Sequence, residues 1–137
     1  MGRTILAVLA GLVVAWITIT LCEFGGVMLY PPPAGTHLAD PDALAAHIAG
    51  APPTAMALVL LGWIAGAFDG GLIAALISRR HKRGAALSIG VLVVLGVIAN
   101  SLMIPHPLWM TVAGLLLPIP AAWLASRLVG GRKAERA

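Results

Sequence analysis

The sequence predicts an all-α membrane protein: a bundle of four transmembrane helices with a short interfacial helix at its outer face. Of its 137 residues, 60% are hydrophobic and only 10% are charged, whereas a soluble domain usually carries about 25% charged residues. Four apolar runs each approach the about 20 residues needed to cross about 30 Å of hydrocarbon. A chain this short has too much surface to hide these runs in a soluble core, so lipid must solvate them.

The whole chain, residues 1–137, is expected to form a single membrane domain. The predicted spans cover residues 4–24, 54–78, 84–104 and 108–129, with residues 25–53 as an outer loop. A continuation of the first span to Tyr30 stays open. The N-terminus begins like a signal peptide, but its apolar run is too long and no small-x-small cleavage site follows. We therefore expect a retained helix.

Positive charge is confined to one side of the four-span arrangement. Arg3, the segment "RRHKR" at residues 79–83, Arg127 and the terminal "GGRKAERA" carry all nine Lys and Arg residues. The other side has none and carries Asp40 and Asp42. The positive-inside rule then predicts that both termini are cytoplasmic. The basic segments have no interleaved aromatics, so we expect them to meet lipid head groups of the bilayer rather than nucleic acid.

The outer loop contains helix punctuation. "YPPP" ends the first span, because consecutive prolines favour an extended polyproline conformation. In "DPDALAAHIAG", Asp40 suits the N-cap, Pro41 the first helical position and Gly50 the terminator. Leu44 and Ile48 share one face, which predicts a short helix on the membrane surface.

The second span carries small residues at four-residue spacing: Gly62, Gly66, Gly70 and Ala74. Small residues let helix backbones approach closely in lipid, so this stripe predicts a tight helix–helix seam. Its partner can be another helix of this chain or a second copy. Two prolines, Pro118 and Pro120, predict a break in the fourth span.

Asp69 lies inside the second span and flanks that seam. An ionised aspartate at such depth costs on the order of 2.5–3.5 kcal/mol. Three arrangements relieve this cost: protonation, a pair with Arg127, or contact with water in a proton or ion pathway. We favour a buried structural contact.

A second set of polar residues is expected near the outer face. This candidate outer-face site comprises Glu23, Asn100, Ser101 and His106. These residue types can bind a head group or a proton, or perform acid–base chemistry, but interfacial hydration and helix packing are the favoured explanation. One carboxylate and one histidine make an incomplete metal set; His37 and His47 lie on a loop that the sequence does not place. We expect no metal and no cofactor, and the single cysteine, Cys22, is expected to pack in the bundle.

The segments "YPPP", "GWIAGAFDGGLIAA" and "NSLMIPHPLW" together resemble a group of small uncharacterised four-span bacterial inner-membrane proteins. The resemblance implies a multi-pass protein of the bacterial inner (cytoplasmic) membrane and implies no activity. The chain is also similar in length and span number to the small multidrug transporters. Those carry their essential glutamate well inside the first span, whereas Glu23 is near the outer end here, which argues against transferring their drug–proton exchange.

Three functions remain. The favoured one is a structural or accessory subunit of a membrane assembly or homo-oligomer, in keeping with the small-residue stripe and the short loops. The first alternative is a small proton- or ion-linked transporter or channel using Asp69. The second is an outer-face membrane enzyme or lipid-head-group binder using Glu23, Asn100 and His106. No phosphate loop, HExxH, Ser-His-Asp order or CxxC is present, so the sequence favours a non-enzymatic role without excluding catalysis.

Overall fold

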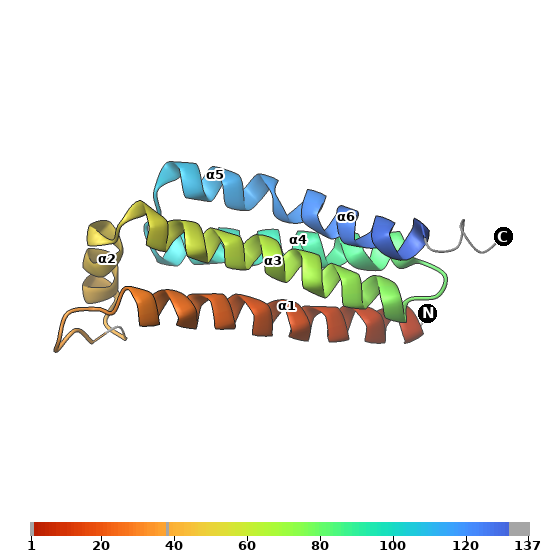
Figure 1. Cartoon of the computed structure of the whole chain (residues 1–137), viewed down its shortest axis with the longest axis horizontal. Helices are drawn as coiled ribbons and strands as arrows, with labels where there is room; N and C mark the ends of the chain where they lie inside the picture. Colours follow the sequence, from red (N-terminus) through yellow and green to blue (C-terminus); the bar gives the residue numbers. More distant parts are fainter. Residues whose placement is uncertain (1, 38, 132–137) are drawn as a thin grey trace.

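The computed structural model describes residues 2–37 and 39–131, and these form helices joined by short connections (Figure 1). The helices are α1 (Gly2–Leu29), α2 (Pro41–Gly50), α3 (Pro53–Ile77), α4 (Lys82–Met103), α5 (Leu108–Leu116) and α6 (Pro118–Gly131). Four helices are long and apolar enough to cross a membrane, the fourth being α5 and α6 taken together. The prediction of an all-α bundle with four spans is confirmed.

The helix α1 is longer than the predicted first span. It continues past residue 24 to Leu29, through Gly25 and Gly26, and the Tyr30 amide still bonds to the Gly26 carbonyl at 2.8 Å. The prolines that begin at Pro31 stop it, because a proline ring disfavours the helical conformation of the residue before it.

The short helix α2 begins as its capping residues predict. The Asp40 carboxylate accepts a hydrogen bond from the Asp42 amide at 3.1 Å, and Pro41 occupies the first helical position. Gly50 is the last helical residue. Figure 1 shows α2 lying across one end of the bundle, away from the Gly2 end of α1.

The glycine stripe of α3 meets α1 of the same chain. A Cβ added at Gly66 would lie 2.9 Å from the Ala15 carbonyl oxygen, and one at Gly62 would lie 2.8 Å from Cys22 Cβ. At Gly70 an added Cβ would collide with the Gly11 carbonyl oxygen. Only glycine lets the two backbones approach this closely, so this seam is intramolecular.

The fourth span is broken where its prolines predict. Leu117 separates α5 from α6, and Pro118 opens α6. The second half, α6, packs closely: a Cβ at Gly90 would lie 3.0 Å from Ile119 Cα. In the first half, α5, the buried ring of Trp63 fills the space between α3 and α5 and contacts Gly114. Because of the break, α5 and α6 can pack against α3 at different distances.

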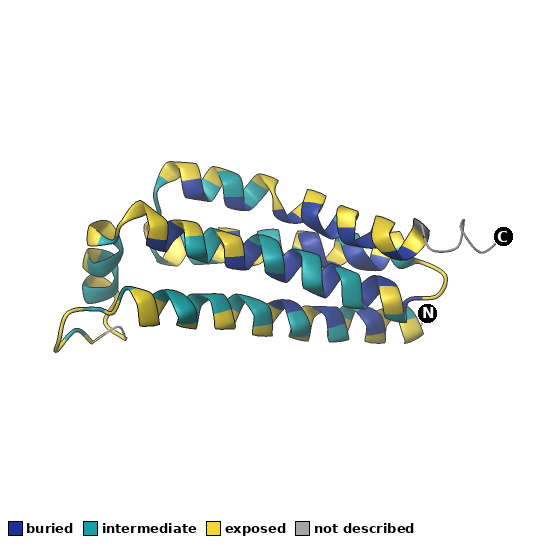
Figure 2. Ribbon diagram, in the orientation of Figure 1, coloured by how far each residue is buried: buried dark blue, intermediate teal, exposed yellow. Residues whose placement is uncertain are grey.

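The outward faces of the helices are apolar. Figure 2 shows buried residues turned toward the bundle interior and exposed residues along its outside. The exposed side chains include Leu6, Trp16, Leu21, Leu102 and Leu128. Such a surface is stable only against lipid, which makes the chain a multi-pass membrane protein.

Candidate functional site

A cavity of about 1170 Å³ occupies the end of the bundle covered by α2. Its walls come from the end of α1, the proline-rich segment and α2, the start of α3, and the end of α4 with the turn that follows it. Apolar side chains such as Met56, Val59 and Ile48 line it beside polar ones. The cavity can therefore accept a molecule that has both an apolar and a polar part.

Three of the four predicted outer-face residues line this cavity. Glu23 comes from α1, Asn100 from the last turn of α4, and His106 from the turn between α4 and α5. Ser101 is not among the lining residues, and its hydroxyl is buried without a hydrogen-bond partner among residues 2–37 and 39–131. Asn100 lies 77 positions and His106 lies 83 positions after Glu23 in the chain. Only the packing of the helices therefore brings the three residues to one cavity.

Glu23 makes no hydrogen bond or ion pair with any residue that the structure describes. It is half-buried in the wall that α1 contributes. By contrast, the other carboxylate at the cavity, Asp40, is occupied as the N-cap of α2. Among the described residues, Glu23 is therefore the acidic group at this site with both carboxylate oxygens free of hydrogen bonds.

The ring of His106 is held in a defined orientation. Its Nδ1 lies 2.8 Å from the Ile104 carbonyl oxygen; because a carbonyl only accepts, Nδ1 carries the proton. The ring also packs edge-on against Trp63, with centroids 5.8 Å apart. In the neutral imidazole, Nε2 is then the nitrogen that can accept a hydrogen bond from a ligand.

The outer loop adds polar groups that the sequence left unplaced. His37, Asp40 and His47 also line the cavity. The Tyr30 and Thr54 hydroxyls lie 2.8 Å apart, which ties the two ends of this loop together. The capping residues of α2 predicted a helix in this loop. No sequence signal predicted that the loop would fold back over the end of the bundle and line the cavity. Within residues 2–37 and 39–131, no three His, Cys, Asp or Glu side chains are grouped to hold a metal ion.

The candidate in-membrane residues Asp69 and Arg127 make no hydrogen bond or ion pair with each other in the described structure. The Thr18 hydroxyl of α1 donates to Asp69 Oδ2 at 3.2 Å. Arg127 is exposed and lies over the ring of Trp123, 4.9 Å from its centroid. Asp69 thus makes a helix–helix contact beside the glycine seam.

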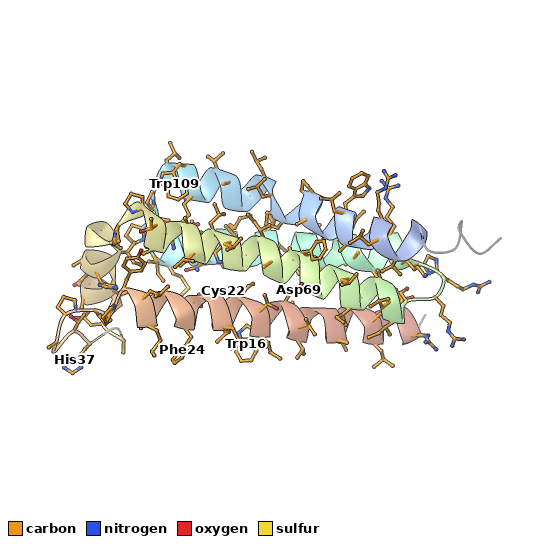
Figure 3. The ribbon with its side chains drawn as sticks, in the orientation of Figure 1. Trp16, Cys22, Phe24, His37, Asp69 and Trp109 are labelled. Carbon is orange, nitrogen blue, oxygen red and sulfur yellow. The ribbon has the colours of Figure 1, made fainter. Side chains whose placement is uncertain are left out.

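Basic side chains gather at the end of the bundle opposite the cavity. Figure 3 shows nitrogen-bearing side chains at the end far from His37. There the Arg3 guanidinium donates to the Ile77 carbonyl oxygen at 2.9 Å and joins the start of α1 to the end of α3. The two ends of the bundle therefore differ in charge.

These features define a helical multi-pass membrane protein with a mixed polar and apolar cavity at its less basic end. No family model, curated protein or solved structure matches the chain.

Proposed function

We propose that the protein binds a lipid-like amphipathic molecule in the cavity at the outer end of the bundle. The observation that carries the proposal is that Glu23, Asn100 and His106, from three separate elements, line one cavity beside apolar side chains. At about 1170 Å³ the cavity slightly exceeds the roughly 300–1,000 Å³ typical of small-molecule sites. A head group and part of an acyl chain fit in such a volume.

We also propose that this cavity opens toward the outer leaflet of a bacterial inner membrane, with both termini cytoplasmic. Support comes from the cations Arg3, Arg79, Arg80 and Lys82, which lie at the other end of the bundle. The acidic residues Asp40 and Asp42 lie on the cavity side.

An accessory role in a larger membrane assembly is a second proposal. It is supported by α1, whose Trp16 is 68% exposed near the middle of its span, although tryptophan usually prefers the membrane interface. The glycine seam does not support a homo-oligomer, because α1 already fills it. Cross-linking from Trp16→Cys, in a Cys22→Ala background in native membranes, tests this role: a protein that forms no adduct with any partner or second copy contradicts it.

The binding proposal is tested by fluorescence of Trp63, whose ring is only 3% exposed and touches His106 at the cavity wall. Trp16, Trp109 and Trp123 are replaced by Phe so that Trp63 is the only source of tryptophan fluorescence and probe dissolved in the surrounding micelle causes little quenching. A monoacylglycerol with a dibrominated chain, added to the protein in dodecyl maltoside micelles, is expected to quench Trp63 saturably, because bromine quenches tryptophan at short range and His106, which packs against Trp63, lines the cavity.

Two α2 variants form a matched pair for this experiment. Ala43 lines the cavity, whereas Ala49 is exposed and does not line it. Ala43→Phe is expected to weaken saturable quenching at least several-fold, and Ala49→Phe to leave it unchanged. Quenching that never saturates, or that both variants change equally, contradicts the binding proposal.

A further inference from the structure

The ionisable side chains that line the cavity include acidic groups but no described Lys or Arg. Its lining includes the carboxylates of Glu23 and Asp40, while none of the lining residues that the structure describes is Lys or Arg. The other titratable lining groups are Tyr30 and the three histidines, His37, His47 and His106. Among the described lining residues, no side chain therefore carries a permanent positive charge to balance the two carboxylates.

The hydrogen-bonding capacity at the cavity points the same way. Glu23 offers two acceptor oxygens that no described residue uses, and His106 in its fixed tautomer offers Nε2 as an acceptor. The Asn100 side chain makes no hydrogen bond with the described residues, and it adds a carboxamide oxygen acceptor beside its NH2 donors. Acceptors from α1, α4 and the turn after α4 thus line the same cavity.

A head group that meets this set must bring positive charge and hydrogen-bond donors. A phosphate or sulfate would face carboxylates with no cation to balance it, which is unfavourable in a partly buried site. An ammonium group donates up to three hydrogen bonds and carries the complementary charge. We propose that the cavity selects amphiphiles whose head group is a cationic amine, with Glu23 as the partner of the ammonium. This inference rests on the proposed binding function and names its ligand class.

The test uses the single-Trp63 protein at pH 8 in uncharged dodecyl maltoside micelles, with three probes that share one dibrominated alkyl chain. One probe is a primary alkylamine, the second is an alkyl sulfate, and the third is the uncharged monoacylglycerol. We expect saturable quenching of Trp63 by the amine at a concentration roughly fivefold lower than by the monoacylglycerol, since a partly exposed ion pair contributes about 1 kcal/mol. The sulfate is expected to bind more weakly than both.

Glu23→Gln keeps the size of the side chain and removes its charge. It is expected to bring the amine and the monoacylglycerol to equal affinity while leaving the monoacylglycerol unchanged. The matched control is Asp42→Asn, because Asp42 lies on α2 but does not line the cavity. The control is expected to keep the amine preference.

The outcomes separate the two proposals. If none of the three probes quenches saturably, the binding function itself fails. If the sulfate or the monoacylglycerol binds as well as the amine in the parent protein, the binding function stands and the amine selectivity is wrong. An amine preference that survives in Glu23→Gln removes Glu23 as its source. If Glu23→Gln does not fold, the order of the three probes in the parent protein still decides the ligand class.

Discussion

The Thr18 hydroxyl donates a hydrogen bond to Asp69 Oδ2 across the interface of α1 and α3, over 3.2 Å. The contact lies beside Gly70, where the two backbones touch. A carboxylate inside a span is costly unless it is paired or hydrogen-bonded, and a neighbouring hydroxyl lowers that cost. The glycine seam brings α1 close enough to α3 for this hydrogen bond. The close packing of the two helices therefore also gives Asp69 its hydrogen-bond donor.

Removing the hydroxyl should destabilise the bundle. Thr18→Val leaves Asp69 without this donor, so we expect the free energy of unfolding to fall by roughly 1–2 kcal/mol. Unfolding in mixed micelles of maltoside and sodium dodecyl sulfate, followed by circular dichroism, measures the change. Thr20→Val is the control, since Thr20 is exposed on the same helix and its side chain makes no hydrogen bond with the residues that the structure describes; equal losses in both variants would contradict a specific role for Thr18.

Asp69→Asn separates a structural contact from a proton pathway. The carboxamide oxygen can still accept from Thr18, so stability should stay within about 0.5 kcal/mol of the parent protein, as for a substitution that keeps its contacts. Proton flux into liposomes containing the protein should be the same for both. A pH-driven flux that the parent shows and Asp69→Asn lacks would instead support the transporter alternative.

Gly70→Ala should be among the most damaging single-methyl additions in this chain. The new Cβ would collide with the Gly11 carbonyl oxygen, which is backbone and cannot move without separating the helices. Overpacking of this kind costs roughly 1–3 kcal/mol, and we expect a loss of that size in the same unfolding assay.

Gly96→Ala is the matched control on α4. An added Cβ there meets nothing within 4 Å, and alanine favours the helix over glycine by about 1 kcal/mol. Gly96→Ala should therefore leave stability unchanged or increase it. If both alanine variants behave alike, the close approach of α1 and α3 is not a determinant of stability.

The orientation of the bundle can be measured with cysteines at its two ends. In a Cys22→Ala background, Thr36→Cys lies in the loop at the cavity end and Arg80→Cys lies between α3 and α4. Intact spheroplasts treated with a membrane-impermeant maleimide should label residue 36 and not residue 80, because positively charged segments stay cytoplasmic. Labelling of residue 80 alone would invert the proposed orientation.

Local sequence properties were enough for much of the fold and for part of the candidate site. The run lengths predicted four spans, and Asp40, Pro41 and Gly50 predicted α2. The positions of Glu23, Asn100 and His106 in the predicted spans suggested that they lie at a similar depth in the membrane. All three do line one cavity. Ser101 was grouped with them and lies outside its lining, because adjacent positions on a helix point about 100° apart.

By itself the sequence determined the helical class, the limits of the spans to within a few residues and the separation of charge along the chain. These depend on hydropathy, capping and loop composition, which are properties of neighbouring residues. The tertiary structure alone decided that α1 fills the glycine seam, that Thr18 rather than Arg127 reaches Asp69, and that the outer loop folds back over a cavity. Those contacts depend on how each helix is rotated about its axis, and helices that are apolar on nearly every side carry little signal for that rotation.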